Sequence, residues 1–138
     1  MQKEVAKRIA ASHGSKNYGV LSISAQFYTK PELKFTVSRK AFVPPPAVDS
    51  AVVHFEVYPS ARFRVSDEAL FKKVVKTAFS QRRKTILNSL KKLDGITDAL
   101  PDAGIDPGLR PETLSIEDFV RLSNALKGIH EFAEKKSV

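Results

Sequence analysis

The side chains of this 138-residue sequence that are best suited to chemistry are cations gathered in one segment. Residues 62–92 hold ten of the 23 Lys and Arg residues but only two of the 15 Asp and Glu residues, so their net charge of +8 equals that of the whole chain. Such a density of cations binds polyanions through ion pairs with phosphate groups. The sequence therefore predicts a polyanionic partner for one segment of an otherwise neutral chain.

Six of these cations share one arc of a predicted long helix that starts at Asp67 and Glu68 and ends at Gly95. At about 100° per residue, an unbroken helix places them on about a third of its circumference, apart from the apolar residues. They are Lys72, Lys73, Lys76, Arg83, Lys84 and Lys91. This arrangement favours contacts with nucleic-acid phosphates. The alternative is a solvated helix face.

Arg82 is the exception, because the same helix places it among the apolar side chains Phe71, Val75 and Ile86. A buried guanidinium requires a partner, so we expect a carboxylate or backbone carbonyls beside it. A break in the helix near Ser80–Lys84 is the alternative that the sequence leaves open.

Other kinds of chemistry have no support in the sequence. The chain has no Cys, which excludes disulfides, thiolate catalysis and Cys-based zinc sites and is compatible with a reducing cytoplasm. Its six Gly residues form no G-x-G cluster for a phosphate or dinucleotide. Its three His residues are too scattered for a metal site. The residues alone therefore favour a cytoplasmic binding module, without a metal, over a complete enzyme.

The elements that position these groups fall into two parts. In the first part we expect a helix over 2–11, strands over 33–37 and 50–57, and an extended loop at Pro44-Pro45-Pro46. Periodicity does not decide between helix and strand for residues 18–29. The second strand has an apolar face, formed by Ala51, Val53, Phe55 and Val57. We expect Asp49 and Ser50 to hold the proline loop through side chain–backbone hydrogen bonds.

The second part is predicted to be helical from residue 67 onwards. A short helix is expected at 98–103, and a last helix begins at Ser115, where Asp118 completes a capping box. Gly128 is the expected stop of this helix, and residues 134–138 are expected to be frayed. No stretch is apolar enough to span a membrane.

Five segments closely resemble one family. They occur in family order from about residue 1 to 127: QKEVA (2–6), YGVLS (18–22), FVPPPAVDS (42–50), AFSQRRKTILNSL (78–90), and RPETLS (110–115) followed by Phe119. The family is that of the small-subunit ribosomal RNA adenine N6-dimethyltransferases, which in bacteria confer kasugamycin sensitivity. The fourth segment separates it from the related erythromycin-resistance methylases of large-subunit RNA.

The resemblance implies an α/β fragment followed by an all-α domain. Residues 1–60 correspond to the last two strands of a Rossmann-like S-adenosylmethionine methyltransferase sheet, with 18–29 as the helix before them, and residues 61–138 correspond to a helical RNA- or ribosome-binding domain. The family's Gly-rich cofactor loop, acidic ribose ligand and catalytic Asn-Leu-Pro-Tyr motif would all precede Met1. S-adenosylmethionine is therefore the cofactor expected of the parent enzyme, and this chain alone is expected to be inactive.

The resemblance also implies roles for site residues. In the family, the aromatic residue at the position of Phe42 stacks on the flipped target adenine, and Pro44 and Pro45 fix its loop. Packing of Phe42 in the core is the alternative. Ala47 stands where the family frequently has Lys, so any phosphate contact of that Lys is lost. The six cations of the helix arc are expected to contact rRNA phosphates.

The function implied is dimethylation of N6 of two adjacent adenines in small-subunit rRNA, with the rRNA and the small subunit as partners. The competing hypothesis is a non-catalytic RNA- or ribosome-binding protein. A sheet that lacks its first strands would also have an exposed edge, which could drive dimerisation.

Overall fold

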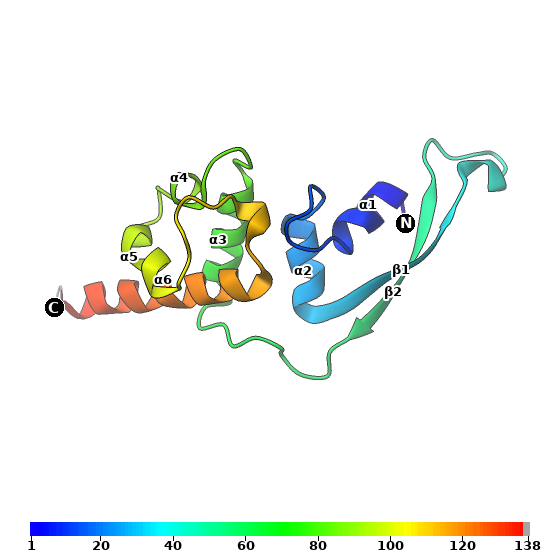
Figure 1. The fold of residues 1–138 in the computed structure, drawn as a ribbon. Coiled ribbons are helices and arrows are strands. Elements are labelled where there is room, and N and C mark those ends of the chain that lie inside the picture. Colours follow the sequence, from blue (N-terminus) through cyan, green and yellow to red (C-terminus); the bar gives the residue numbers. More distant parts are fainter. Residues whose placement is uncertain (137–138) are drawn as a thin grey trace. The chain divides into compact units, whose positions relative to one another are not determined.

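The computed structural model describes residues 1–136 and divides the chain into two compact units, Met1–Arg62 and Phe63–Val138 (Figure 1). The first unit combines helices with a two-stranded sheet, and the second unit is helical. This arrangement agrees with the expected order of an α/β part followed by an all-α part. Among the described residues, no helix is long and apolar enough to cross a membrane.

The first unit is built around an antiparallel hairpin. Its elements are α1 (Lys3–Ile9), α2 (Val20–Tyr28), β1 (Thr29–Val37), the 3-10 helix η1 (Arg39–Ala41) and β2 (Ser50–Val57). The pairing runs from Thr29 opposite Val57 to Val37 opposite Ser50, with an irregularity between Leu33 and Phe35. The strand predicted at 50–57 is confirmed, and the other strand begins four residues earlier than expected. Residues 20–28 are helical, as the resemblance implies.

Helices α1 and α2 are joined by polar side chains of α2. The Gln26 side-chain amide donates hydrogen bonds to the carbonyls of Ile9 (2.9 Å) and Ala11 (2.7 Å), and the Ser22 hydroxyl donates to the Arg8 carbonyl. Arg8 and Ile9 are the last residues of α1 and Ala11 lies just beyond it, so their carbonyls have no amide partner within the helix. Gln26 and Ser22 therefore fix the position of α1 against α2.

Only one end of the apolar face of β2 is covered within this unit. Ala51 is buried at 2% exposure and Val53 is half-buried, whereas Phe55 is 39% and Val57 70% exposed. The backbone at Met1 pairs with the outer edge of β2 at Ala51, through Met1 N to Ala51 O (3.1 Å) and Ala51 N to Met1 O (2.8 Å). This pairing protects only the beginning of that edge.

Among its described residues, the second unit packs four α-helices and one 3-10 helix around one core. Its elements are α3 (Glu68–Phe79), α4 (Ile86–Ser89), α5 (Ile96–Asp102), the 3-10 helix η2 (Pro111–Thr113) and α6 (Ile116–Lys136). Side chains from every helix are fully buried: Val74, Ile86, Leu100, Phe119, Leu122 and Leu126 are each at most 1% exposed. The core is therefore shared by elements that are distant in sequence.

The long helix predicted from Asp67 to Gly95 is interrupted, in agreement with the alternative of a break near Ser80–Lys84 that the sequence leaves open. Helix α3 ends at Phe79, and residues 81–84 form a turn before α4. The Thr85 side chain caps α4 by accepting a hydrogen bond from Asn88 N (3.2 Å). The first amides of α4 are satisfied from a distant loop, through Ile86 N to Leu109 O (2.6 Å) and Leu87 N to Pro107 O (3.3 Å). These long-range bonds compensate for the interruption of the helix.

The start of α6 is confirmed and its expected stop is wrong. Asp118 N donates to the Ser115 hydroxyl (3.1 Å) and Ser115 N donates to the Asp118 carboxylate (2.9 Å), which is the reciprocal capping box. The helix continues through Gly128 to Lys136. Gly128 does not adopt the positive φ with which a glycine ends a helix. Residues 134–136 are helical, and the rest of the predicted frayed tail lies outside the described residues.

Candidate nucleic-acid interface

Helix α3 separates apolar and cationic side chains onto different faces. Phe71, Val74, Val75 and Ala78 are buried in the core of the second unit. The N-cap Asp67 accepts a hydrogen bond from Leu70 N (3.1 Å), which fixes the first turn of the helix. Because the apolar face is held in the core, the opposite face of α3 must remain exposed.

The structure places all six predicted phosphate-binding side chains on the surface, in three places. Lys72, Lys73 and Lys76 lie on the exposed face of α3, Arg83 and Lys84 lie in the turn after it, and Lys91 follows α4. Within residues 1–136, none of the six forms an ion pair with a carboxylate. We call these six residues the cationic surface. Their positive charge is not neutralised by neighbouring side chains.

The prediction that Arg82 is buried is wrong. It lies in the exposed turn after α3, with its guanidinium carbon 5.7 Å from the centre of the Phe79 ring. The helix ends before Arg82 reaches the position that an unbroken helix would give it. The guanidinium therefore lies over an aromatic ring at the surface.

The proline loop is closed at its base by Asp49. The Asp49 carboxylate accepts a hydrogen bond from Arg39 N (2.9 Å), and the Asp49 carbonyl accepts one from Lys3 N (3.0 Å). The predicted role of Asp49 as a side chain–backbone tether of the loop is thereby confirmed. The Val43–Pro44 peptide bond is cis.

Phe42 is presented on this loop and not buried under it. Its side chain is 44% exposed, and the neighbouring Val43 is 99% exposed. Packing of Phe42 in the core of this chain is therefore excluded. Pro44 and Pro45 are also exposed, so the loop offers an apolar surface with one aromatic ring.

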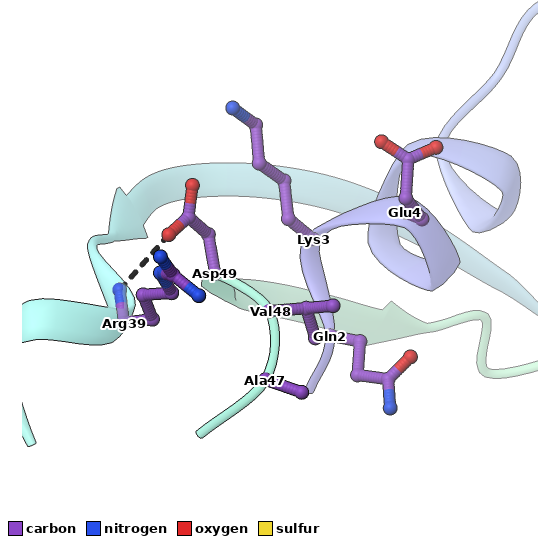
Figure 2. Close-up of a pocket in the computed structure, with 7 residues that line it drawn as sticks. All are labelled: Gln2, Lys3, Glu4, Arg39, Ala47, Val48 and Asp49. Carbon is purple, nitrogen blue, oxygen red and sulfur yellow. Dashed lines mark hydrogen bonds between the residues drawn. The ribbon is translucent and has the colours of Figure 1, made fainter. Parts of the chain in front are cut away.

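A pocket of about 340 Å³ lies at the base of the proline loop (Figure 2). It is lined by the first residues of α1 and by both ends of the loop: Gln2, Lys3, Glu4, Arg39, Ala47, Val48 and Asp49. The sequence predicted no function for Lys3 or Arg39, because both lie outside the cationic segment. The segment 2–6, which carries part of the family resemblance, contains Lys3, whereas Arg39 lies outside all five segments.

Potential metal ligands do not gather in one place among the described residues. No group of three or more His, Asp and Glu side chains is placed to hold a metal ion within residues 1–136.

Known proteins resemble this chain over most of its length. The family model "Ribosomal RNA adenine dimethylase" matches residues 1–128. Ribosomal RNA small subunit methyltransferase A of Caldanaerobacter subterraneus subsp. tengcongensis is 47% identical over 130 residues, which cover 91% of this chain and 48% of that protein. The protein of the same name from Bacillus mycoides is 48% identical over 134 residues, which cover 91% of this chain and 46% of that protein. The chain spans about half the length of these relatives.

Solved structures agree with this relationship. A dimethyladenosine transferase from Plasmodium falciparum superposes with a TM-score of 0.73 at 25% identity, covering 98% of this chain and 56% of that protein. The 23S rRNA methyltransferase ErmE shares the fold, with a TM-score of 0.61 at 21% identity over 91% of this chain and 52% of that protein. The match to the family model extends through both units and all five segments that carry the resemblance. The chain therefore belongs to the ribosomal RNA adenine dimethylase family.

Proposed function

We propose that this chain is the target-binding and rRNA-docking part of an enzyme that dimethylates N6 of two adjacent adenines in small-subunit rRNA. The observation that carries this proposal is the family match over residues 1–128, together with 47–48% identity to proteins named as rRNA small subunit methyltransferases. The substrate is then the rRNA within the ribosomal small subunit, and the place of action is the cytoplasm.

The cationic surface is the proposed contact with rRNA phosphates. Its six side chains are exposed and lack carboxylate partners among residues 1–136, so they remain available for an external polyanion. Phosphate contacts of this kind position a protein on RNA and weaken as salt is added, but they carry little sequence information. The choice of the target adenines must therefore come from another part of the protein.

The proline loop is the proposed contact with the target base. An adenine that leaves its stack loses favourable contacts with its neighbours, and an aromatic face can replace them. The exposed ring of Phe42 and the neighbouring Pro44 and Pro45 offer such a face. The Asp49 tether limits the motion of the loop, so less entropy is lost when the base binds.

The methyl donor of the parent enzyme is proposed to be S-adenosylmethionine, which supplies an electrophilic methyl group. The N6 amine of adenine is a poor nucleophile, because its lone pair is delocalised into the ring. Methylation then depends on holding the base in line with the donor, which is an effect of proximity and orientation. The role of this chain is to hold the base and the RNA. The donor is proposed to be held by another part of the enzyme, so we expect the chain alone to be inactive.

A methyl-transfer assay combined with co-sedimentation tests this proposal. The 138-residue chain is incubated with small subunits that lack the dimethyladenines and with radiolabelled S-adenosylmethionine. We expect the chain to sediment with the subunits in a salt-dependent manner and to transfer no label. Turnover of label, or tight binding of S-adenosylmethionine in calorimetry, would contradict the assignment of the cofactor site to another part of the enzyme. Absence of binding to the subunits would contradict the docking role.

Dimerisation through the sheet edge remains a prediction of the same fold. Among the described residues, the outer edge of β2 is paired only near Ala51, and Phe55 and Val57 beyond it are exposed. Light scattering at several protein concentrations tests this prediction. A mass that stays at the monomer value would contradict it.

A further inference from the structure

The pocket at the base of the proline loop combines cations and hydrogen-bond acceptors in a small volume. Its volume of about 340 Å³ is comparable to that of known small-ligand sites. Lys3 and Glu4 come from the first turn of α1, and Arg39 and Asp49 come from the two ends of the loop (Figure 2). Four charged side chains from three segments therefore line one hollow.

Two of these side chains are available to an anion. Neither Lys3 nor Arg39 forms an ion pair with a carboxylate within the part of the chain that the structure describes. Ammonium and guanidinium groups form charge-assisted hydrogen bonds to phosphate oxygens, and these bonds are about twice as strong as neutral ones. Both cations that line the pocket can therefore bind phosphate oxygens.

The two carboxylates limit the kind of anion that fits. One oxygen of Asp49 already accepts the Arg39 amide at 2.9 Å, whereas no hydrogen bond to the Glu4 carboxylate is formed within residues 1–136. The charges of Lys3, Arg39, Glu4 and Asp49 cancel, so a polyphosphate with several negative charges is disfavoured. A group that presents one phosphate together with hydroxyl or amine donors matches these side chains better. A single ribonucleotide has this composition, because its 2′-hydroxyl donates as well as accepts.

We propose that this pocket binds one ribonucleotide of the target strand, next to the base held by Phe42. Lys3 and Arg39 contact its phosphate, and Glu4 and Gln2 accept from or donate to its sugar and base. The position supports this assignment, since Arg39, Ala47, Val48 and Asp49 flank the loop that carries Phe42. The inference rests on the proposed function and adds to it a second, polar contact with the RNA strand beside the target base.

The walls of the pocket are held in place by hydrogen bonds of the backbone. Lys3 N donates to Asp49 O (3.0 Å), which joins the beginning of α1 to the end of the loop. Arg39 N donates to the Asp49 carboxylate, which joins the other end of the loop to the same residue. A ligand therefore meets a site that is already assembled, and binding costs little ordering entropy.

Chemical shift titration of the 15N-labelled chain tests the proposal. The probes are 5′-AMP, adenosine, inorganic phosphate and 5′-phosphorylated ApA. We expect saturable shifts of the amides of Lys3, Arg39 and Val48, with the affinity order phosphorylated ApA, then 5′-AMP, then adenosine. Adenosine lacks the phosphate, so the chain should bind it about tenfold more weakly than 5′-AMP, as expected when one charge-assisted hydrogen bond is lost.

Matched variants separate this pocket from general electrostatic attraction. Lys3→Gln with Arg39→Gln should weaken 5′-AMP binding by about tenfold or more, as expected from the loss of charge-assisted bonds. Lys7→Gln with Arg8→Gln removes the same charge from exposed positions of α1 outside the pocket and should leave the affinity unchanged. Lys3→Arg with Arg39→Lys keeps both charges and should restore binding.

Three results would overturn the proposal. The first is equal weakening by the pocket pair and the α1 control pair, and the second is a set of shifts that includes none of the seven lining residues. The third is tighter binding of 5′-AMP or phosphate than of phosphorylated ApA, which would indicate a site for free nucleotide or phosphate instead of RNA. If the pocket variant does not fold, the affinities of the unmodified chain for 5′-AMP and adenosine still show whether the phosphate contributes to binding. Failure of the docking role has a separate readout, because it would appear as loss of binding to small subunits and not in the shift titration.

Discussion

The carboxylate of Asp49 accepts a hydrogen bond of 2.9 Å from the backbone amide of Arg39 and so joins the two ends of the loop that carries Phe42. The two residues are ten positions apart, and the segment between them contains three consecutive prolines. A proline-rich segment cannot form a regular hydrogen-bonded element, because three of its residues lack a backbone donor. The hydrogen bond of Asp49 therefore holds together the ends of a loop that regular secondary structure cannot fix.

Removal of the tether should loosen the base of the loop. In Asp49→Ala the Arg39 amide loses its acceptor, and its hydrogen exchange should accelerate by about fivefold, as expected for the loss of a bond worth about 1 kcal/mol. Asp49→Asn retains a side-chain oxygen at this position and should keep most of the protection. Amide exchange followed by NMR measures both variants. Equal exchange rates of Arg39 in Asp49→Ala and the unmodified chain would show that the tether does not hold the loop.

Loss of the exposed ring of Phe42 should weaken base binding without affecting the fold. Stacking of a base on an aromatic ring contributes about 1–3 kcal/mol, so Phe42→Ala should bind an RNA hairpin with two adjacent adenines at least about fivefold more weakly. Its free energy of unfolding should change by less than about 0.5 kcal/mol, because the side chain is 44% exposed. Val43→Ala, at the 99% exposed neighbour, is the matched control and should change neither quantity. Fluorescence of 2-aminopurine at the target position reports the stacking directly, and an unaltered signal in Phe42→Ala would exclude Phe42 from base binding.

Two glycines of the second unit should respond in opposite ways to alanine. Gly95 has φ +86°, and a Cβ there would lie 2.7 Å from Ile129 Cγ2, so Gly95→Ala should destabilise the protein by more than about 1 kcal/mol. Gly128 lies inside α6, and a Cβ there would meet no neighbouring atom, so Gly128→Ala should stabilise the protein by about 0.5–1 kcal/mol. Urea unfolding followed by far-UV circular dichroism measures both changes. Changes of the same sign would contradict the geometry of this unit.

The capping box of α6 should make stability depend on acid pH. Partial burial raises the pKa of Asp118, but hydrogen bonds from Ser115 and Arg121 outweigh this effect and hold the pKa below its ordinary value of 3.8. A carboxylate with a lowered pKa stabilises the folded state above pH 3.8, and this contribution is lost as the pH falls through the lowered value.

Asp118→Ala should therefore unfold more easily at neutral pH, by about 1 kcal/mol as is typical of a lost helix cap. The gap to the unmodified chain should narrow as the pH falls below 3.8. Urea unfolding at several pH values measures this gap. Glu131→Ala, at an exposed position further along α6, is the control and should show a change within about 0.5 kcal/mol at each pH. A gap for Asp118→Ala that is constant with pH would contradict the assigned role of the carboxylate.

Local signals in the sequence were sufficient for the elements that depend on neighbouring residues. Ser115 and Asp118 predict the start of α6 because a capping box involves only residues three positions apart. The strand at 50–57 follows from its alternation of apolar and polar residues and the proline after it. Asp49 was predicted as a loop tether for the same reason, since short polar side chains near turns bond to nearby backbone groups.

Features that depend on distant residues were not predictable from local patterns. The sequence leaves open whether the helix breaks near Ser80–Lys84, because the carbonyls of Leu109 and Pro107 that bond the first amides of α4 lie far along the chain. The hydrogen bonds of Asn124 also depend on distant residues. Its side chain accepts a hydrogen bond from Ser66 N (2.9 Å) and donates one to Arg64 O (2.8 Å), some 60 residues away. Periodicity carries no information about such pairs. The pocket at Lys3 and Arg39 likewise exists only once α1 and the proline loop are brought together.

Salt-dependent binding to small-subunit rRNA shows whether the cationic surface docks the chain on RNA. Affinity for the small subunit is measured over a range of salt concentrations for the unmodified chain, for Arg83→Glu with Lys84→Glu on the cationic surface, and for Lys7→Glu with Arg8→Glu as a control with the same change in charge. We expect the cationic-surface variant to bind more weakly and its slope of log affinity against log salt to be smaller by about 2, one for each lost phosphate contact. The control should keep the slope of the unmodified chain. An unchanged affinity and slope in the cationic-surface variant would contradict the docking role and make this surface a solvated face of the domain.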